Sequence, residues 1–117
     1  MEQAKGMKIS AVIITFNEED RLPDALASLQ GIADEIVVVD SYSTDRTLAI
    51  AKAAQSRVWQ NRFEDYGQQK NFALGKAAHE WILNLDADER VSPELKRAIG
   101  DLKAKAAPPE VAAFVIK

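Results

Sequence analysis

Short runs of branched apolar residues recur along this chain, and segments with helical spacing lie between them. Each run is rich in Val, Ile or Leu and too short for a typical helix, so each predicts a buried strand. Strand and helix alternating in this way predict an α/β fold with a mostly parallel sheet and right-handed crossovers. The predicted strands are residues 8–14, 35–39, 57–60, 80–85 and 111–116.

Local signals place helices between these strands. Asp20 is expected to cap the first helix, which has Pro23 in its first turn and stops at Gly31. One face of that helix carries Leu22, Leu26 and Leu29. Three further helices are expected: one capped by Thr44 or Asp45 and running to Ala54, one over residues 67–78, and one opening at Ser92-Pro93-Glu94 and ending near Lys105.

Polar residues follow three of the predicted strands at the point where each one ends. These clusters are residues 15–18, 40–43 and 86–88. The carboxyl ends of parallel strands meet at one edge of a sheet, and ligands of such sheets bind beyond that edge. We therefore expect the three clusters, with the carboxylates of Asp40, Asp86 and Asp88, to converge on a single cleft.

Asp86 and Asp88 form the sharpest chemical feature of the sequence, an Asp-x-Asp motif at a strand end. Mg²⁺ and Mn²⁺ bind through one or two carboxylates and complete their shell with water and substrate phosphate oxygens. The other interpretation is a solvated acidic turn that caps the next helix. The position at a strand end, with Asp40 ending another strand, favours a metal–diphosphate site.

Other polar residues near this edge allow two interpretations each. Asp40 follows four apolar residues, so its carboxylate needs hydrogen-bond donors, either from a ligand or from the turn that follows. Asn17 and Glu18 are either ligand contacts or helix caps. Lys70 is either a cation facing phosphate or a base carbonyl, or an ordinary surface lysine.

Composition and missing motifs exclude several classes of protein. A net charge of −3 argues against a nucleic-acid surface, and the absence of Cys excludes disulfides and thiolate chemistry. No glycine-rich phosphate loop follows the first strand, and no nucleophile elbow is present. No apolar run reaches the ~20 residues of a membrane span, so a cytoplasmic location is expected. We interpret His79 as structural and Trp59 and Trp81 as core residues.

Four motifs, in this order along the chain, resemble family 2 glycosyltransferases. They are TFNEE at 15–19, VVVDS and STDRT within 37–47, QKNFAL at 69–74 and LNLDADE at 83–89. The resemblance covers about residues 9 to 95. It extends to the branch similar to lipopolysaccharide-core β-1,4-glucosyltransferases, because the sequence ERVSPEL follows Asp88 directly.

The resemblance implies a GT-A fold, that is, a Rossmann-like, mostly parallel sheet flanked by helices. It implies an inverting enzyme that transfers a sugar from a nucleotide-sugar of the UDP type to a glycan or lipopolysaccharide-core acceptor. It implies Asp88, together with Asp86, as ligands of a divalent cation, Mg²⁺ or Mn²⁺. By the same likeness Asp40 meets the uracil, Lys70 and Asn71 face the base or diphosphate, and the remaining substrate-binding residues are Thr15, Asn17, Glu18 and Asp86.

The chain departs from the family pattern in three ways. Tyr42 stands where relatives usually carry Gly, so the turn after Asp40 is expected to take another shape or to cover part of the base. His79-Glu80 replaces a Gly-acid pair. Family members are also considerably longer, so residues 1–117 are expected to be the N-terminal, nucleotide-sugar-binding portion.

That difference in length carries further expectations. The acceptor site and the general base would lie beyond residue 117, so these residues should bind donor and metal with little or no transfer. A sheet that ends near residues 111–116 exposes an edge, which favours a homodimer. Association with the inner face of the membrane would come from the second half. Two alternatives stay open: a non-catalytic nucleotide- or metal-binding module, and a phosphoaspartyl signalling domain built on Asp40, Asp86, Asp88 and Lys70.

Overall fold

A single parallel sheet forms the centre of the molecule. The computed structural model describes residues 7–105 and 113–115, and within them the strands are ordered β3-β2-β1-β4-β5. Every neighbouring pair runs parallel, which confirms the sheet predicted from the sequence. The bounds lie within a few residues of those expected: β1 Ile9–Thr15, β2 Glu35–Asp40, β3 Arg57–Gln60, β4 Trp81–Asn84 and β5 Ala113–Val115.

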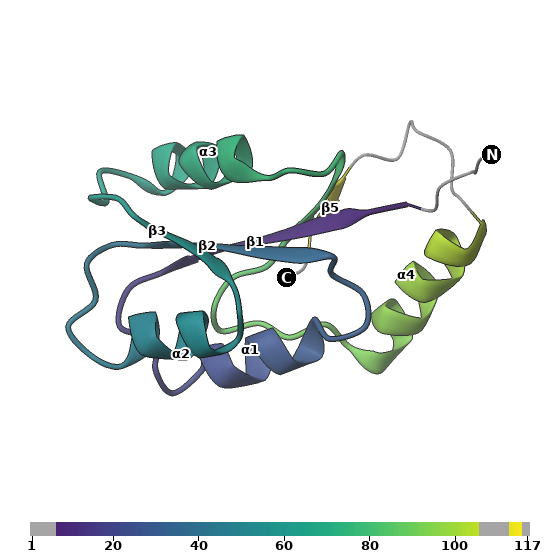
Figure 1. Cartoon of the computed structure of the whole chain (residues 1–117), viewed down its shortest axis with the longest axis horizontal. Coiled ribbons are helices and arrows are strands. Elements are labelled where there is room, and N and C mark those ends of the chain that lie inside the picture. Colours follow the sequence, from purple (N-terminus) through teal and green to yellow (C-terminus); the bar gives the residue numbers. More distant parts are fainter. Residues whose placement is uncertain (1–6, 106–112, 116–117) are drawn as a thin grey trace.

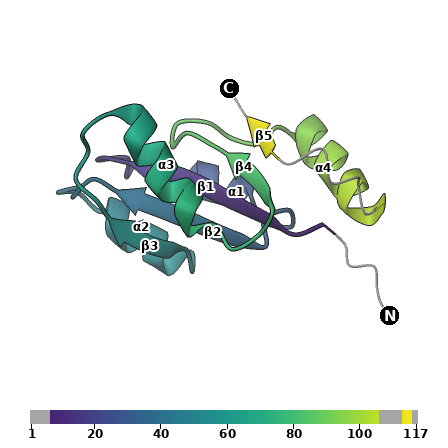
Figure 2. The same ribbon diagram turned by 90° about the horizontal axis from the view of Figure 1, so that it is seen from above.

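Helices cover both faces of this sheet, so the α/β class is confirmed. The helix α3 lies over one face, and α1, α2 and α4 lie on the other (Figure 1). Seen from above, α3 runs across the strands near β1 and β2 (Figure 2), in agreement with its contacts to both. The helices are α1 Leu22–Ser28, α2 Thr47–Ala53, α3 Tyr66–Lys76 and α4 Pro93–Lys105.

The central strands are buried on both sides, with alternate residues facing opposite layers. Ile9, Ala11 and Ile13 of β1 pack into the larger core with α1, whereas Val12 packs into the smaller core with Ala73 of α3. All five side chains are shielded from solvent. This two-sided burial explains why the strands read as continuous apolar runs rather than as alternating patterns.

The first residues of the helices show which of the predicted N-cap residues are correct. The prediction for Asp20 is wrong: α1 begins after Arg21 without a side-chain cap, and the backbone N–H of Leu22 donates instead to the Glu18 carbonyl at 2.8 Å. The cap predicted at Thr44 or Asp45 is also displaced: α2 begins after Arg46, which forms no side-chain cap bond, although the Asp45 carboxylate accepts from the N–H of Thr47 at 2.9 Å. Ser92 likewise accepts from the N–H of Leu95, at 3.1 Å.

The two tryptophans differ in their burial. Trp81 is a core residue, 7% exposed, as predicted. Trp59 is partly buried against the smaller core, and the cationic groups of Arg57 and Lys76 lie 4.9 and 5.3 Å from its ring centroid. The backbone N–H of His79 donates to the Ser10 hydroxyl at 3.0 Å, which supports the structural interpretation of that position.

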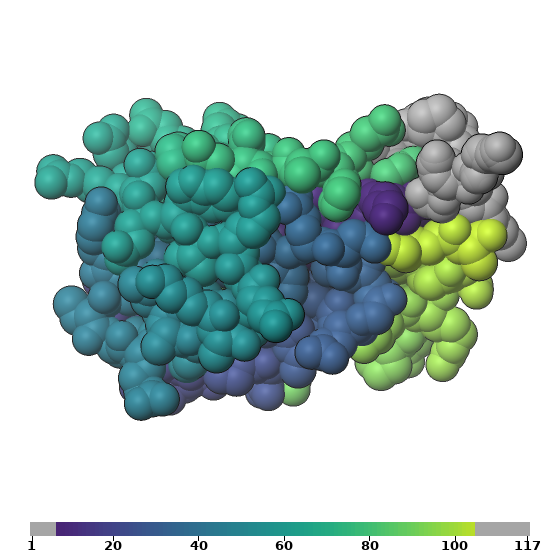
Figure 3. All heavy atoms as spheres, in the orientation of Figure 1, coloured from purple at the N-terminus to yellow at the C-terminus, as the bar shows by residue number. Residues whose placement is uncertain are grey.

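The ends of the chain are described only in part. The predicted break at Pro108-Pro109 lies outside the described residues, and the last predicted strand is described at residues 113–115 alone. No helix within residues 7–105 is long and apolar enough to cross a membrane. The molecule measures 46 × 26 × 25 Å, with α4 at one end of its long axis (Figure 3).

Candidate functional site

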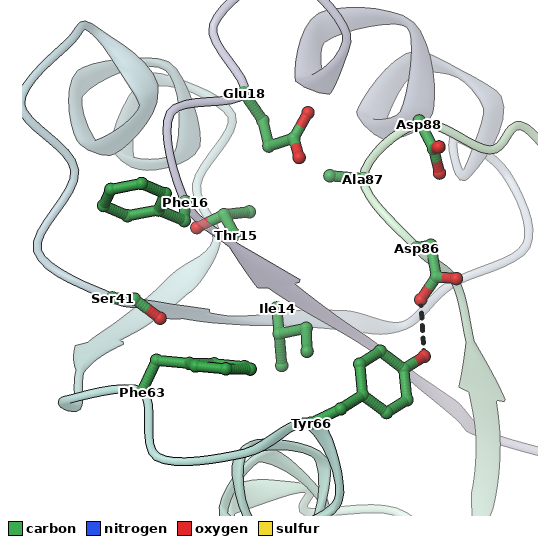
Figure 4. Close-up of a pocket in the computed structure, with 10 residues that line it drawn as sticks. All are labelled: Ile14, Thr15, Phe16, Glu18, Ser41, Phe63, Tyr66, Asp86, Ala87 and Asp88. Atoms are coloured by element: carbon green, nitrogen blue, oxygen red, sulfur yellow. Dashed lines mark hydrogen bonds between the residues drawn. The ribbon is translucent and has the colours of Figure 1, made fainter.

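A cleft of about 260 Å³ opens at the carboxyl edge of the sheet. The ends of β1 and β2, the turn after β4 and the segment that leads into α3 form its walls (Figure 4). The predicted convergence of the strand ends on one site is therefore confirmed for residues following β1, β2 and β4. The lining residues are Ile14, Thr15, Phe16, Glu18, Ser41, Phe63, Tyr66, Asp86, Ala87 and Asp88.

Strand register explains why distant polar residues meet here. Thr15 pairs with Asp40 across β1 and β2, and Val12 pairs with Asn84 across β1 and β4. Just beyond β4, the N–H of Leu85 still donates to the Val12 carbonyl, at 3.1 Å. The residues that follow these positions leave the sheet together, at the edge where parallel α/β sheets bind ligands.

Both aspartates of the Asp-x-Asp turn line this cleft. The turn is closed by two hydrogen bonds: the N–H of Asp86 donates to the Glu89 carboxylate at 3.0 Å, and the N–H of Glu89 donates to the Asp86 carbonyl at 2.9 Å. Ala87, 4% exposed, packs into the core between the two acids. A buried alanine therefore anchors the turn while Asp86 and Asp88 remain at the cleft.

Two donors on α3 hold the side chain of Asp86. The Tyr66 hydroxyl donates to Asp86 Oδ1 at 2.9 Å, and Lys70 Nζ lies 3.5 Å from the same oxygen (Figure 4 shows the Tyr66 bond). Lys70 also donates to Asn84 Oδ1 at 3.3 Å. Burial lowers the pKa of Lys70, although the charges of Asp86 and Glu89 oppose this. Burial and the bond to Asp86 raise the pKa of Tyr66 to about 12.

Glu18 adds a third carboxylate to the lining. Burial, reinforced by the negative charges of Asp88 and Asp45, raises its pKa despite the nearby Arg21. In the part of the chain that the structure describes, no three His, Asp or Glu side chains lie close enough to hold a metal ion unaided. The site thus has excess negative charge and an incomplete ligand set, which suits a cation that arrives with a phosphorylated ligand.

Asp40 does not share the cleft, which corrects the expectation that the three aspartates converge there. Its side chain is fully buried. Its Oδ1 accepts from the Thr15 hydroxyl at 2.7 Å and from the Ser43 hydroxyl, and its Oδ2 accepts from the Ser43 N–H at 2.8 Å and from Gln60 Nε2 at 3.4 Å. The physical reason is that the turn and neighbouring strands supply the donors that a desolvated carboxylate requires.

Three other predicted contact residues, Asn17, Lys70 and Asn71, are also absent from the cleft lining, although Lys70 contacts the lining residue Asp86. Asn17 accepts from the N–H of Thr44 at 2.8 Å, while its own N–H donates to the Ser43 hydroxyl at 2.8 Å. It therefore links the loops that follow β1 and β2. Asn71 is an exposed residue on α3. Their roles in binding stay predictions.

Tyr42 has a backbone conformation that favours glycine. Its φ of 60° lies in the left-handed region, and its side chain is 57% exposed. The expectation of a ring over the base finds no support among the described residues, because Tyr42 is not among the cleft-lining residues. The expectation of a turn with another shape stays a prediction. The turn accommodates the tyrosine at a cost in backbone strain.

Sequence reasoning missed the aromatic side of the cleft. Phe16, Phe63 and Tyr66 all line it and are 56%, 49% and 54% exposed. Exposed aromatic residues gathered at one cleft are typical of binding surfaces. The predicted helix over residues 67–78 left Tyr66 in the preceding loop. The structure begins α3 at Tyr66, which places it one turn before Lys70 on the same helix face.

Comparison with protein families gives a match over most of the chain. The family described as "Glycosyl transferase family 2" matches residues 10–108. An uncharacterized glycosyltransferase of Rickettsia bellii is 46% identical over 99 residues, which is 85% of this chain and 34% of that protein. A lipopolysaccharide core biosynthesis glycosyltransferase, LpsC of Rhizobium meliloti, is 40% identical over 103 residues, 84% of this chain and 38% of that protein.

Solved structures give the same result. S. aureus TarS in complex with UDP matches with a TM-score of 0.64 and 31% identity, covering 80% of this chain and 31% of that one. Glucosyl-3-phosphoglycerate synthase from Mycobacterium tuberculosis, in complex with Mn²⁺, UDP and glucosyl-3-phosphoglycerate, matches with a TM-score of 0.62 and 26% identity, covering 73% and 36%. The chain spans about a third of the length of the curated relatives it matches.

Proposed function

The chain belongs to family 2 of the glycosyltransferases and has the GT-A fold, and from this we propose that it binds the sugar donor of an inverting transferase. The donor is a UDP-sugar and the acceptor a glycan or lipopolysaccharide core. The observation that carries the proposal is that Asp86 and Asp88 line one cleft with Glu18 and exposed aromatic residues. Residues 1–117 form the N-terminal, donor-binding portion, and the acceptor site and general base belong to further sequence.

The residues at the Asp-x-Asp turn fit a divalent cation. Carboxylate oxygens are the ligands that Mg²⁺ and Mn²⁺ prefer, and these ions keep several positions for water and phosphate oxygens. Asp86 and Asp88 would hold the cation. When bound, it supplies positive charge that stabilises the diphosphate as the sugar–phosphate bond breaks. Among the structures similar to this one, the glucosyl-3-phosphoglycerate synthase complex contains Mn²⁺ and UDP, which supports this assignment.

The chain's own side chains have distinct roles in this proposal. Tyr66 and Lys70 orient Asp86, because both lie within contact distance of its Oδ1. Lys70 also offers a cation with a depressed pKa beside the diphosphate position, where a negative ligand would restore its usual protonation. Phe16 and Phe63 shield the nucleoside from water.

Asp40 acts indirectly in this proposal. It orients Thr15, whose hydroxyl donates to it at 2.7 Å, and it shapes the turn at Ser43. Its burial also argues against the phosphoaspartyl alternative, because a phosphorylated aspartate must be reached by the phosphodonor.

Calorimetric titration with UDP, with and without Mn²⁺, tests the proposal. Wild-type protein should bind UDP more tightly with Mn²⁺ than without, and Asp88→Ala should weaken the Mn²⁺-dependent binding by about tenfold or more, or ~1.4 kcal/mol. The matched control is Asp24→Ala, which removes an exposed acid of α1 that lies 3.8 Å from Arg90. Equal UDP affinity with and without metal contradicts the cation site, and absence of UDP binding contradicts the donor assignment.

A further inference from the structure

Gln69 is a buried amide whose polar atoms all have partners. It lies on α3, is 1% exposed, and faces the ends of β2 and β3. Its Nε2 donates to the backbone carbonyl of Asn61 and to the Ser41 hydroxyl oxygen, both at 3.0 Å. Its Oε1 accepts from Asn61 Nδ2 at 2.9 Å. These bonds use both amide protons and the amide oxygen.

The carbonyl of Asn61 sets the orientation of this amide. A backbone carbonyl only accepts hydrogen bonds, so the side-chain atom of Gln69 that faces it must be the nitrogen. The reversed amide would place two oxygens against each other inside the protein, which is unfavourable. Gln69 therefore presents an N–H to Ser41, and the Ser41 oxygen is an acceptor in that bond.

This leaves the Ser41 hydroxyl with one proton to donate in another direction. Among the described residues, the Ser41 hydroxyl donates to no acceptor of the chain. The backbone N–H of Ser41 donates to the Thr15 carbonyl at 2.9 Å. Ser41 lines the cleft, and its hydroxyl is drawn toward the cavity (Figure 4). The free proton is thus available to a ligand.

The position of Ser41 within the cleft indicates which part of a ligand it meets. Figure 4 shows Ser41 with Phe16 and Phe63 on one side of the cavity and Asp86 and Asp88 on the other. A nucleoside diphosphate whose phosphates lie at the aspartates would extend its base toward the aromatic side. The edge of a pyrimidine farthest from the sugar carries the substituent at C4, which is a carbonyl in uracil and an amino group in cytosine.

We propose that the Ser41 hydroxyl contacts this edge of the base and can act there only as a hydrogen-bond donor. Gln69, whose amide orientation is set by Asn61, is the positioning residue, because its N–H occupies the acceptor side of the Ser41 oxygen. The inference rests on the proposed binding of a nucleoside diphosphate. The Ser41 hydroxyl would donate to the C4 carbonyl oxygen of uracil. In cytosine the group at C4 is an amino group, so two donors would face each other, which is unfavourable. The pair Ser41–Gln69 thus selects a keto base over an amino base.

Competition between UDP and CDP, measured by calorimetry with Mn²⁺, tests this proposal. Wild-type protein should prefer UDP by about tenfold or more. Ser41→Ala should lower the UDP:CDP affinity ratio at least about fivefold, because the donor is removed while the aromatic walls remain. Gln69→Glu should lower the ratio as well, since a carboxylate accepts the Ser41 proton and turns the hydroxyl oxygen toward the base.

Ser28→Ala is the matched control for general destabilisation. The Ser28 hydroxyl donates to the Ala25 carbonyl at 2.7 Å and accepts from the Val91 N–H at 3.0 Å, away from the cleft-lining residues. That variant should lose stability and keep the wild-type UDP:CDP ratio. Ser41→Ala carries the test alone if Gln69→Glu does not fold.

The outcomes separate this inference from the proposed function. Tight UDP binding with an unchanged UDP:CDP ratio in Ser41→Ala overturns the role of Ser41 and leaves the donor site intact. Wild-type protein that binds neither UDP nor CDP overturns both. A ratio that falls in Ser41→Ala and stays unchanged in Ser28→Ala supports the proposal.

Discussion

The two edges of the sheet contain similar polar residues and use them in opposite ways. At the amino edge, Glu35 accepts from the Ser10 hydroxyl, the Ala78 N–H and Arg57, and Asp34 accepts from the Ile9 N–H and Lys103. At the carboxyl edge, Glu18, Asp86 and Asp88 line an open cleft. Each of the two amino-edge acids accepts from at least two donors of the chain. At the cleft, Tyr66 and Lys70 contact Asp86, but three carboxylates line one open space, and the charge of Asp88 helps to raise the pKa of Glu18.

The pKa shifts of the two edges differ in sign. Burial tends to raise the pKa of Asp34 and Glu35, but their hydrogen bonds outweigh it and hold both below the ordinary values. At the cleft, burial and neighbouring acids raise the pKa of Glu18, and burial lowers that of Lys70. The amino edge favours the charged forms of Asp34 and Glu35, and the cleft disfavours the charged forms of Glu18 and Lys70. The amino edge therefore stabilises the fold, whereas the cleft needs a ligand to balance its charges.

The largest expected effect comes from breaking the amino edge. Glu35→Ala removes the acceptor for the fully buried Ser10 and for the Ala78 N–H, and should lower the free energy of unfolding by about 2–4 kcal/mol. Urea denaturation followed by circular dichroism measures the loss. Asp24→Ala is the control, because it removes a pair in which both side chains are 70% exposed and should change stability by less than ~0.5 kcal/mol. Equal effects of the two variants would contradict the comparison.

The second expected effect is the response of stability to acid. Because the folded-state pKa values of Asp34 and Glu35 lie below the ordinary 3.8 and 4.5, the unfolded chain takes up these protons first as pH falls. Their contribution is therefore complete above the unfolded values and is lost as pH falls through the folded ones. Urea midpoints should drop between about pH 5 and about pH 3, and Glu35→Gln should flatten that drop. A slope as steep in Glu35→Gln as in wild type would argue against this assignment.

A smaller effect of opposite sign is expected at the cleft. Glu18→Gln removes a charge that burial, Asp88 and Asp45 disfavour, so it should raise the free energy of unfolding at pH 7 by about 0.5 kcal/mol at most. Part of this gain is offset by the lost pair with Arg21, which lies 3.9 Å away. The same variant should weaken UDP binding in calorimetry. Destabilisation by more than ~1 kcal/mol would place Glu18 with the structural acids instead.

The smallest effect is expected at the turn beside the cleft. The left-handed backbone of Tyr42 costs roughly 1 kcal/mol, and glycine recovers this but loses a similar amount of chain entropy on folding. Tyr42→Gly should therefore raise the free energy of unfolding, measured by urea denaturation, by no more than about 0.5 kcal/mol. Tyr42→Ala, which keeps the strain and removes the ring, is the comparison variant. A large loss in both variants would show that the exposed ring packs more tightly than its 57% exposure indicates.

Much of the fold could be predicted from short-range patterns. The apolar runs located the strands because residues such as Val37 and Val38 are buried on opposite faces of the sheet, which demands apolar side chains at successive positions. The cap at Ser92 was predictable because it acts within three residues of the chain. The predicted cap at Asp20 was wrong because the local signal did not include the backbone path around Glu18, whose carbonyl takes the helix N–H groups.

By itself, the sequence determined the order of the elements, the parallel sheet and the position of Asp86 and Asp88 at a strand end, because these depend on local periodicity and on the geometry of strand–helix–strand units. Tertiary structure alone decided that Asp40 is enclosed by Thr15, Ser43 and Gln60 while the other two aspartates stay open. The packing of α3 likewise decided that Tyr66 meets Asp86 and that Gln69 meets Ser41. The physical reason is that the environment of a polar side chain depends on donors that come from distant parts of the chain.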